Sequence, residues 1–387
     1  MNRFEIKGWC PSALRPMASG DGLVVRLRPH GGRLSSDQAS RIAELSNRYG
    51  NGLIDLTGRA NLQIRGVNAQ SHEALIEALA RLEMIDANLE TETRRNILIA
   101  PFWSEGDETP SLGAELERAL ATSSLDLPEK FGFAVDCGAE RALAQAPADI
   151  RIERGTEGGL LVRADGAREG RAVTRAEAVD IALALAKWFV ASGGVKDGRG
   201  RMAAHIASGA TLPNAMAANA KPLPAFVLPR PGLYAVGALV GLAFGQIRSE
   251  TLGYLADLAP GLRMTPWRMI LAEAACEMPR HEDLVTRADD PLLRVVACTG
   301  APSCPEAHAQ TRRLAATLAP HVDADERLHV SGCAKGCAHP GPSTFTLVGT
   351  ANGFDLVRQG TTRDPPALQG LDPATILSDV DALVGAG

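Results

Sequence analysis

The order of predicted strands and helices repeats along the chain, and this duplication limits the possible folds more than any single motif does. In the first copy, residues 22–29 form a predicted strand and residues 52–66 give further alternating strand material. Between them, a helix over residues 35–49 begins with the capping box Ser35-x-x-Gln38. The first copy is therefore a compact strand–helix–strand unit.

The second copy begins after Pro231. An apolar stretch starts at Leu233, a helix is predicted over residues 250–258, and strand material follows at 262–271. Thr57 and Arg59 of the first copy match Thr265 and Arg268 of the second, because each pair places a Thr shortly before an Arg at the start of an apolar strand.

The later part of each copy also matches in outline. Residues 131–136 and 160–163 are echoed by 344–348 and 355–358, with Asn352-Gly353 as a hairpin turn. A capping box at Thr174-x-x-Glu177 predicts a helix of about four turns, and residues 305–318 predict another that begins just after Cys304. The fold class is α+β or α/β, and the proline-rich residues 213–231 form an extended linker between the halves.

Composition excludes several classes of protein. With 387 residues, 45% hydrophobic and 22% charged, the chain is expected to be globular with two or three domain-sized units. A net charge of -5 gives no reason to expect nucleic acid or an anionic membrane as partner. No apolar run is long enough to cross a bilayer, and the N-terminal ten residues lack the apolar core of a secretory signal, so a cytoplasmic location is expected.

Four cysteines form the strongest chemical motif. Cys298 and Cys304 are separated by five residues, and Cys333 and Cys337 by three. Four thiolates suit a [4Fe-4S] cluster, with one thiolate for each iron. Cys304 is expected at the N-terminus of the predicted helix, where the helix dipole favours a thiolate. A structural zinc site is the alternative, although its usual spacing is two to four residues. Three further cysteines are expected to be ordinary buried residues, namely Cys10, Cys137 and Cys276.

The two cysteine pairs, each beside a glycine, resemble the cluster signature of sulfite and nitrite reductases, and the duplicated halves resemble that family's architecture. The resemblance implies an internally duplicated α+β fold with paired ferredoxin-like half-domains and two α/β domains of the cluster- and tetrapyrrole-binding type. It divides the chain into half-domain 1–88, α/β domain 89–212 without cluster ligands, linker 213–231, half-domain 232–290 and cluster domain 291–387.

The resemblance also implies a site for the carboxylates of a tetrapyrrole. Residues 56–65 resemble the family's tetrapyrrole-contacting strand, and two further positions resemble its other contacts. Clustered cations suit a macrocycle that carries acetate and propionate groups. The implied contacts are Arg59, Asn61, Gln63, Arg95, Asn96 and Lys130. Arg26 and Arg28 lie two residues apart and therefore on the same face of the predicted strand. They could contact the carboxylates or be solvated surface residues, and the two alternatives are equally open.

The sequence departs from the anion reductases at one informative position. Those enzymes carry a second lysine two residues beyond the one matched by Lys130, whereas this chain has Gly132. Residues 8–23, 130–133 and 333–340 instead resemble the precorrin-3B synthase branch of the family. That branch implies precorrin-3A as substrate, hydroxylation at C20 with lactone formation by a ring A acetate, O2 as co-substrate and electrons ultimately from NADH.

The resemblance further implies a mononuclear non-haem iron. Its ligands stay unassigned among His30, His205, His308 and His339, since no two of them show metal spacing. No glycine-rich dinucleotide motif follows a predicted strand, so the electrons are expected from a separate reductase or ferredoxin. Two other functions remain open: a sirohaem-dependent nitrite or sulfite reductase, and an iron-sulfur electron-transfer protein.

Overall fold

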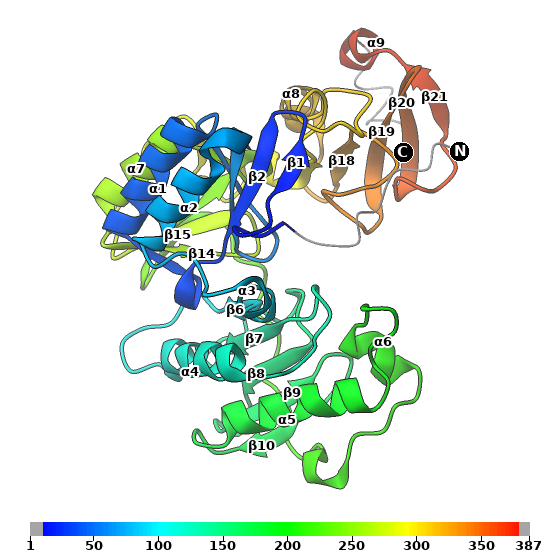
Figure 1. The fold of residues 1–387 in the computed structure, drawn as a ribbon. Helices are drawn as coiled ribbons and strands as arrows, with labels where there is room; N and C mark the ends of the chain where they lie inside the picture. Colours follow the sequence, from blue (N-terminus) through cyan, green and yellow to red (C-terminus); the bar gives the residue numbers. More distant parts are fainter. Residues whose placement is uncertain (1–10, 379–387) are drawn as a thin grey trace.

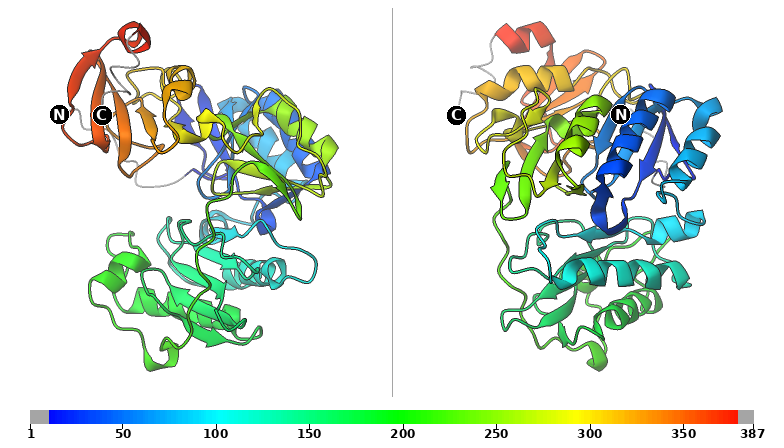
Figure 2. Two further views of the ribbon diagram at one scale, coloured as in Figure 1. Left: turned by 180° about the vertical axis from the view of Figure 1, so that it is seen from behind. Right: turned by 90° about the vertical axis from the view of Figure 1, so that its left-hand side faces the viewer.

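The computed structural model describes residues 11–378, which form four β-sheets (Figure 1). Two sheets lie together in the middle of the molecule, and their helices cover the side that faces away from the C-terminal unit. One α/β unit lies below the central sheets and the other beside them, as two further views show (Figure 2).

The two central sheets have equivalent strand orders. The first runs β1 (Met17–Ser19), β2 (Gly22–Leu27), β5 (Leu62–Val67), β4 (Leu53–Leu56) and β13 (Gln246–Arg248). The second runs β11 (Gly232–Tyr234), β12 (Gly237–Leu242), β15 (Met269–Glu273), β14 (Gly261–Met264) and β3 (Arg33–Ser35), and β16 (Leu284–Val285) also pairs with β12. The predicted duplication is confirmed by this order.

Each central sheet ends on a strand from the other half of the sequence. β13 pairs antiparallel with β4, and β3 pairs antiparallel with β14. The helices that follow these exchanged strands, α1 (Ser36–Tyr49) and α7 (Ser249–Leu258), contact each other. Their apolar residues, such as Ile42 and Leu255, belong to one core with those of both sheets. The two half-domains therefore share one hydrophobic interior.

The α/β unit of the first half follows α2 (His72–Ala80) and has its own core. Its sheet has the order β10-β9-β8-β7-β6, in which β6, β7 and β8 are parallel and the others antiparallel. Its elements are α3 (Leu89–Arg94), β6 (Ile97–Ile99), α4 (Glu108–Thr122), β7 (Phe133–Asp136), β8 (Ile150–Arg154), β9 (Leu160–Ala164), β10 (Arg171–Val173), α5 (Ala178–Ala191) and α6 (Met202–Ala207).

The α/β unit of the second half repeats this topology around a third core. Its strands β17, β18 and β19 are parallel, while β20 and β21 continue antiparallel. Its elements are β17 (Val295–Ala297), α8 (Arg312–Leu318), β18 (Leu328–Ser331), β19 (Ser343–Thr350), β20 (Gly353–Gly360), β21 (Leu368–Leu371) and α9 (Pro373–Ser378). Short 3-10 helices lie at η1 (His30–Gly32), η2 (Ala69–Ser71), η3 (Asn214–Met216), η4 (Ala243–Gly245), η5 (Pro291–Arg294) and η6 (Ala319–His321).

This topology corrects one part of the predicted match between the halves. Residues 131–136 contain β7, whose topological counterpart is β18 and not the strand at 344–348, which corresponds to β8. The match of 160–163 with 355–358 is right, because β9 and β20 are equivalent. Short apolar strands resemble one another in sequence, so alternation alone did not distinguish β18 from β19. The hairpin between β19 and β20 is confirmed, with Thr350 opposite Gly353.

Two predicted helix starts are also corrected. α8 begins at Arg312, because the preceding residues bond to other loops: the carbonyl of Ala309 accepts from the N–H of Ala301. Cys304 therefore does not lie at a helix N-terminus. α5 begins at Ala178, four residues after Thr174, whose N–H and hydroxyl both donate to the carboxylate of Glu177.

The segment 213–231 runs along the first α/β unit, with isolated bridges from Ala220, Pro222 and Ala225 to that unit. Within residues 11–378, every helix is too short or too polar to cross a membrane.

Candidate functional site

The first central sheet has one apolar face and one polar face. Leu62 and Ile64 of β5 are fully buried in the shared core. On the opposite face, Arg26, Gln63, Asp55 and Gln246 lie in one row across β2, β5, β4 and β13, because each is directly opposite the next. Side chains directly opposite one another lie on the same face of a sheet. Asn61 and Arg65 extend this polar face along β5 (Asn61, Gln63, Arg65, Asp55, Arg26 and Gln246, hereafter the polar face).

The turn between β4 and β5 brings Arg59 to a second element of the site. Thr57 shapes this turn, since its hydroxyl accepts from the N–H groups of Arg59 (3.3 Å) and Asn61 (3.2 Å). Nη2 of Arg59 donates to the carbonyl of Lys130 at 2.8 Å, and the side chain of Lys130 is exposed. Arg59 is thus bonded to the backbone of a second predicted site residue, which lies 71 residues away in sequence.

Gly132 is enclosed by two predicted site residues. A Cβ at this position would lie 2.8 Å from Nδ2 of Asn96 and 3.1 Å from Nη1 of Arg59. Nδ2 of Asn96 also donates to the carbonyl of Phe131 at 2.8 Å, which holds the loop against the site. The guanidinium of Arg59 therefore occupies the space into which a side chain at position 132 would project.

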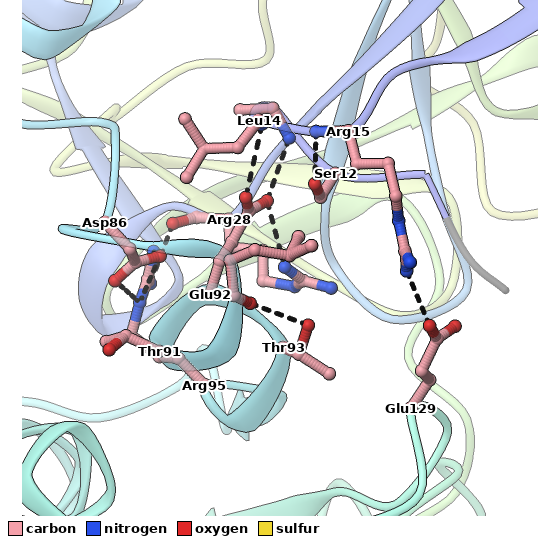
Figure 3. Close-up of polar contacts among 12 residues, drawn as sticks. Ser12, Leu14, Arg15, Arg28, Asp86, Thr91, Glu92, Thr93, Arg95 and Glu129 are labelled. Atoms are coloured by element: carbon pink, nitrogen blue, oxygen red, sulfur yellow. Dashed lines mark hydrogen bonds and ion pairs between the residues drawn. The ribbon is translucent and has the colours of Figure 1, made fainter. Parts of the chain in front are cut away.

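Arg95 lies in a buried network of structural contacts (Figure 3). It is 5% exposed, its Nε and Nη2 donate to Asp86, and its Nη1 donates to the carbonyl of Arg28. Because a carboxylate of the protein already binds this guanidinium, the predicted contact of Arg95 with a substrate carboxylate has no support in the structure.

Arg28 belongs to the same network. Burial lowers the pKa of its guanidinium to about 10, with Glu92 acting against the shift, so the group stays charged at neutral pH. Nη1 of Arg28 donates to Glu92, which also accepts from the N–H groups of Ala13 and Leu14 (Figure 3). Arg28 thus anchors the segment that leads into β1.

In the second copy, the positions that match Arg59, Asn61 and Gln63 are apolar. Both β-turns hold a residue with positive φ, Ala60 at 55° and Arg268 at 61°. This alignment corrects the predicted match of Arg59 with Arg268, because Arg59 corresponds to Trp267. By the same alignment Asn61 and Gln63 correspond to Met269 and Leu271. Those three residues of the second copy pack in an apolar cluster with Phe102 and Tyr234.

The four predicted cluster cysteines lie on two adjacent loops. Cys298 and Cys304 follow β17, and Cys333 and Cys337 follow β18, its parallel neighbour. The loops bond to each other, since the N–H of Gly332 donates to Sγ of Cys298 at 3.2 Å. The N–H of His308 in turn donates to the carbonyl of Gly332 at 2.8 Å. The structure therefore brings both pairs to one end of the last sheet.

The thiols interact electrostatically. Burial raises the pKa of Cys333, the N–H of Lys335 opposes this, and neighbouring Cys304 and Cys298 raise the pKa further. Burial likewise raises the pKa of Cys337. Thiolates so arranged need a cationic group to be stable together, and four sulfur donors with nearby backbone N–H groups fit an iron-sulfur cluster.

The distance between the four thiols bears on the choice between zinc and a cluster. In the described part of the chain, no three His, Cys, Asp or Glu side chains are close enough to hold a single metal ion. A zinc site would draw all four sulfurs to about 2.3 Å from one ion, whereas cluster thiolates bind different irons and lie further apart. The arrangement of the thiols is therefore compatible with the larger group.

The remaining cysteines differ from one another. Cys137 is buried as predicted, and burial raises its pKa. Cys276 is exposed, so its predicted burial is wrong: it follows β15 in a surface loop and not within an apolar strand. Cys10, together with residues 8 and 9 of the N-terminal resemblance, lies outside the described residues.

Three of the histidines considered for a second iron have other ring partners. The ring of His30 contacts Glu117, that of His205 contacts Ser192, and that of His339 contacts the carbonyl of Pro342. The contact of His308 in the cysteine loops is made by its backbone N–H. No ligand set for a second iron is found in residues 11–378.

One buried histidine was missed from the sequence. His329 on β18 is fully buried, and burial lowers its pKa to about 4, so its ring is neutral at physiological pH. Its ring lies 6.0 Å from that of His339, centre to centre. A single histidine in a short strand gives no sequence signal of such an environment.

Comparison with known proteins agrees with this architecture. Residues 15–82 match the family described as "Nitrite/Sulfite reductase ferredoxin-like half domain". The chain is 29% identical to a precorrin-3B synthase from Sinorhizobium sp, over 93% of this chain and 84% of the relative. It is 25% identical to a ferredoxin–nitrite reductase from Synechococcus elongatus, over 88% and 78%. The structure of the NirA protein of Mycobacterium tuberculosis superposes with a TM-score of 0.64 at 17% identity, covering 93% of this chain and 79% of that one. The chain is therefore a homologue of precorrin-3B synthase with a sulfite/nitrite reductase-like fold.

Proposed function

We propose that this chain is a precorrin-3B synthase, an oxidoreductase of cobalamin biosynthesis. It hydroxylates precorrin-3A at C20, and a ring A acetate closes a lactone. The observation that carries the proposal is the group Arg59, Asn61 and Gln63 beside the Lys130 loop, because the matching positions of the other repeat are apolar. The 29% identity to a precorrin-3B synthase over nearly the whole chain supports the same substrate.

Substrate binding is assigned to four residues. Arg59 and Lys130 hold carboxylates of the macrocycle. Asn61 and Gln63, on the same face of the sheet, offer hydrogen bonds. A charge-assisted hydrogen bond contributes about 1.5 to 3 kcal/mol when well made. Asn96 acts indirectly by holding the 131–132 loop, and Arg95 is assigned a structural role for the reason given above.

The redox part of the site is assigned to the cysteine loops. Cys298, Cys304, Cys333 and Cys337 hold a [4Fe-4S] cluster, which supplies electrons when bound. Incorporation of one atom of O2 leaves the other to be released as water, so two electrons and two protons are required for each turnover. The mononuclear non-haem iron that the family resemblance implies has no ligand set among residues 11–378, so no step of the reaction is assigned to it. The electrons derive from NADH through a separate reductase or ferredoxin, since the chain shows no dinucleotide-binding motif.

The runner-up function is a sirohaem-dependent nitrite or sulfite reductase, favoured by the 25% identity to a nitrite reductase. Against it stands Gly132, where the space for an anion-binding lysine is taken by Arg59 and Asn96. Purified protein with sirohaem would show a strong visible band, whereas a cluster alone gives broad absorption. An iron-sulfur electron-transfer protein is the remaining alternative, and it would have no use for the polar face.

The deciding experiment is aerobic incubation of the reconstituted protein with precorrin-3A and a reductant, followed by mass analysis. We expect a product that has gained one oxygen atom, and no such product under argon. Unchanged precorrin-3A in the presence of an intact cluster would refute the proposed reaction. NADH oxidation by the purified chain alone would refute the separate electron donor.

A further inference from the structure

The loop that carries the first cysteine pair is held by the other half of the molecule. The carbonyl of Ser303, next to Cys304, accepts from the N–H of Gly20 at 3.0 Å and from the hydroxyl of Ser19 at 2.5 Å. Nη2 of Arg65 lies 3.4 Å from the same oxygen. Three donors from the first half-domain thus converge on one carbonyl of residues 298–304, hereafter the cluster loop.

Arg65 is the centre of this contact. It is 6% exposed, and its Nε and Nη2 donate to Asp21 at 3.1 and 2.7 Å. Its Nη1 lies 3.6 Å from Asp55, which also accepts from Arg312 at 3.1 Å. Asp21, Arg65, Asp55 and Arg312 therefore form a row of alternating charges, which runs from the β1–β2 turn to the first residue of α8.

The guanidinium of Arg65 is held between two carboxylates of the protein. All three of its nitrogens have protein partners, two of them carboxylates. Its Nε and Nη2 are hydrogen-bonded within the protein, and its Nη1 faces Asp55, so two carboxylates of the protein already balance its charge on the strand that follows Asn61. Its position suits the orientation of the loop and not the binding of the macrocycle.

The second half of the molecule repeats this device with the charges exchanged. By the alignment of the repeats, Asp55 and Arg65 correspond to Arg263 and Glu273, which form an ion pair at 2.6 Å. Nη1 of Arg263 donates to the carbonyls of Pro101 and Trp103, at 2.6 and 2.7 Å. Those carbonyls belong to the loop after β6, the counterpart of the cluster loop, which contains no cysteine. Each central sheet therefore fixes the loop of the opposite repeat.

Close packing reinforces the contact at the cluster loop. A Cβ on Gly20 would lie 2.1 Å from the carbonyl oxygen of Pro302. Backbone atoms cannot yield as a flexible side chain can, so any side chain at position 20 would push the loop away.

We propose that Arg65, together with Ser19, Gly20, Asp21 and Asp55, positions the cluster loop and thereby sets the lifetime of the cluster. Arg65 is a positioning residue, because it acts on the cluster loop through the Ser303 carbonyl. This inference rests on the proposed cluster at Cys298, Cys304, Cys333 and Cys337. In this way β5 carries both a proposed tetrapyrrole contact, Gln63, and a contact to the cluster loop, Arg65.

The test compares two pairs of matched variants after anaerobic reconstitution of the full chain. Arg65→Lys keeps the charge but loses the forked geometry, and Arg263→Lys does the same at the loop without cysteines. Gly20→Ala pushes on the cluster loop, whereas Gly159→Ala adds a methyl group in open space. The readouts are iron content, the rate at which a chelator removes iron, the spectrum of the reduced cluster and the urea midpoint of the apoprotein.

We expect Arg65→Lys and Gly20→Ala to lose iron about tenfold faster than the wild type or more, with an altered spectrum of the reduced cluster. Arg263→Lys and Gly159→Ala should retain the wild-type rate and spectrum, even if Arg263→Lys lowers the urea midpoint. Equal rates in Arg65→Lys and Arg263→Lys would overturn the inference, because the effect would then be general destabilisation. If Arg65→Lys does not fold, the comparison of Gly20→Ala with Gly159→Ala decides alone.

A wild-type protein that takes up no cluster would also overturn it. Precorrin-3A is absent from these measurements, so a failure to hydroxylate that substrate counts against the proposed reaction and not against the role of Arg65.

Discussion

Arg59 is the residue that joins the β4–β5 turn to the Lys130 loop, and its loss should weaken binding of the tetrapyrrole. Arg59→Ala removes one charge-assisted contact and the bond to the Lys130 carbonyl. A loss of about 1.5 to 3 kcal/mol corresponds to a fall in affinity of roughly 10- to 150-fold. Titration with precorrin-3A under argon measures this directly.

The matched control is Arg287→Ala, which removes an exposed arginine paired with Asp289. The affinity of Arg287→Ala for precorrin-3A should equal that of the wild type. If Arg59→Ala binds precorrin-3A as tightly as this control, Arg59 is not a carboxylate contact and the electron-transfer alternative gains support.

Asp136 gives a prediction about stability and pH. Its carboxyl is 1% exposed, and burial raises its pKa from 3.8 to about 7, although the N–H of Leu143 donates to it at 2.7 Å. Because the folded protein binds this proton more tightly, the stabilisation is complete below pH 3.8 and is lost as the pH rises through about 7. Asp136→Asn removes this dependence and keeps an oxygen for Leu143.

The measurement is urea unfolding of both proteins between pH 5 and 8. The free energy of unfolding of Asp136→Asn should rise relative to the wild type across this range, by at most about 3 kcal/mol. Parallel pH profiles would show that Asp136 is ionised throughout.

At the scale of single elements, the start of α1 is the best-defined prediction of local structure. The hydroxyl of Ser35 accepts from the N–H of Gln38 at 3.1 Å, and Oε1 of Gln38 accepts from the N–H of Ser35 at 3.0 Å. Ser35→Ala should lower the free energy of unfolding by about 1 kcal/mol. Arg41→Ala, on the exposed side of the same helix, should change it by no more than about 0.5 kcal/mol. Equal effects in urea unfolding would contradict a specific role for the cap.

The elements also show what sequence reasoning can and cannot provide. The capping box and the repeated strand–helix–strand order are local signals, so α1, α7 and the duplication were predicted from them. The start of α8 depends on the bond of Ala309 to Ala301 and on that of His308 to Gly332, which follows the next strand, and no helical pattern in the sequence records these bonds. For this reason the helix was predicted seven residues too early and Cys304 was given a helix dipole that it lacks.

The candidate site shows the same limit. Arg59 and Lys130 were predicted and are brought together, whereas Arg95 has the same residue type but is paired with Asp86. Sequence gives the charge of a side chain, and only the fold gives its partner. Arg65 lies in the strand that was predicted to contact the tetrapyrrole, but its partners Asp21 and Ser303 lie 44 and 238 residues away and have no local signal in the sequence.

At the scale of the whole molecule, the exchange of β3 and β13 makes the two halves dependent on each other. Each half-domain sheet has an outer strand that only the other half can supply. A unit cut at residue 88 or begun at residue 232 would expose the edge of β4 or β14, and unpaired edges promote aggregation. The same exchange places each α/β unit against the opposite repeat, so the polar face meets the cluster loop.

Separate expression of residues 1–212 and 213–387 tests this dependence. Neither fragment should reach the unfolding temperature of the full chain, because the half-domain core is shared by Ile42 and Leu62 from the first half and Leu255 and Ile270 from the second, and only the α/β unit of each fragment has a core of its own. Co-expressed fragments should associate and recover a single transition, since the exchanged strands and the α1–α7 contact need no continuous chain. Circular dichroism during heating, with size-exclusion chromatography of each sample, provides the measurement. A fragment that melts cooperatively as a monomer at the temperature of the full chain would show that the duplicated halves are autonomous domains and that the exchange contributes nothing to their stability.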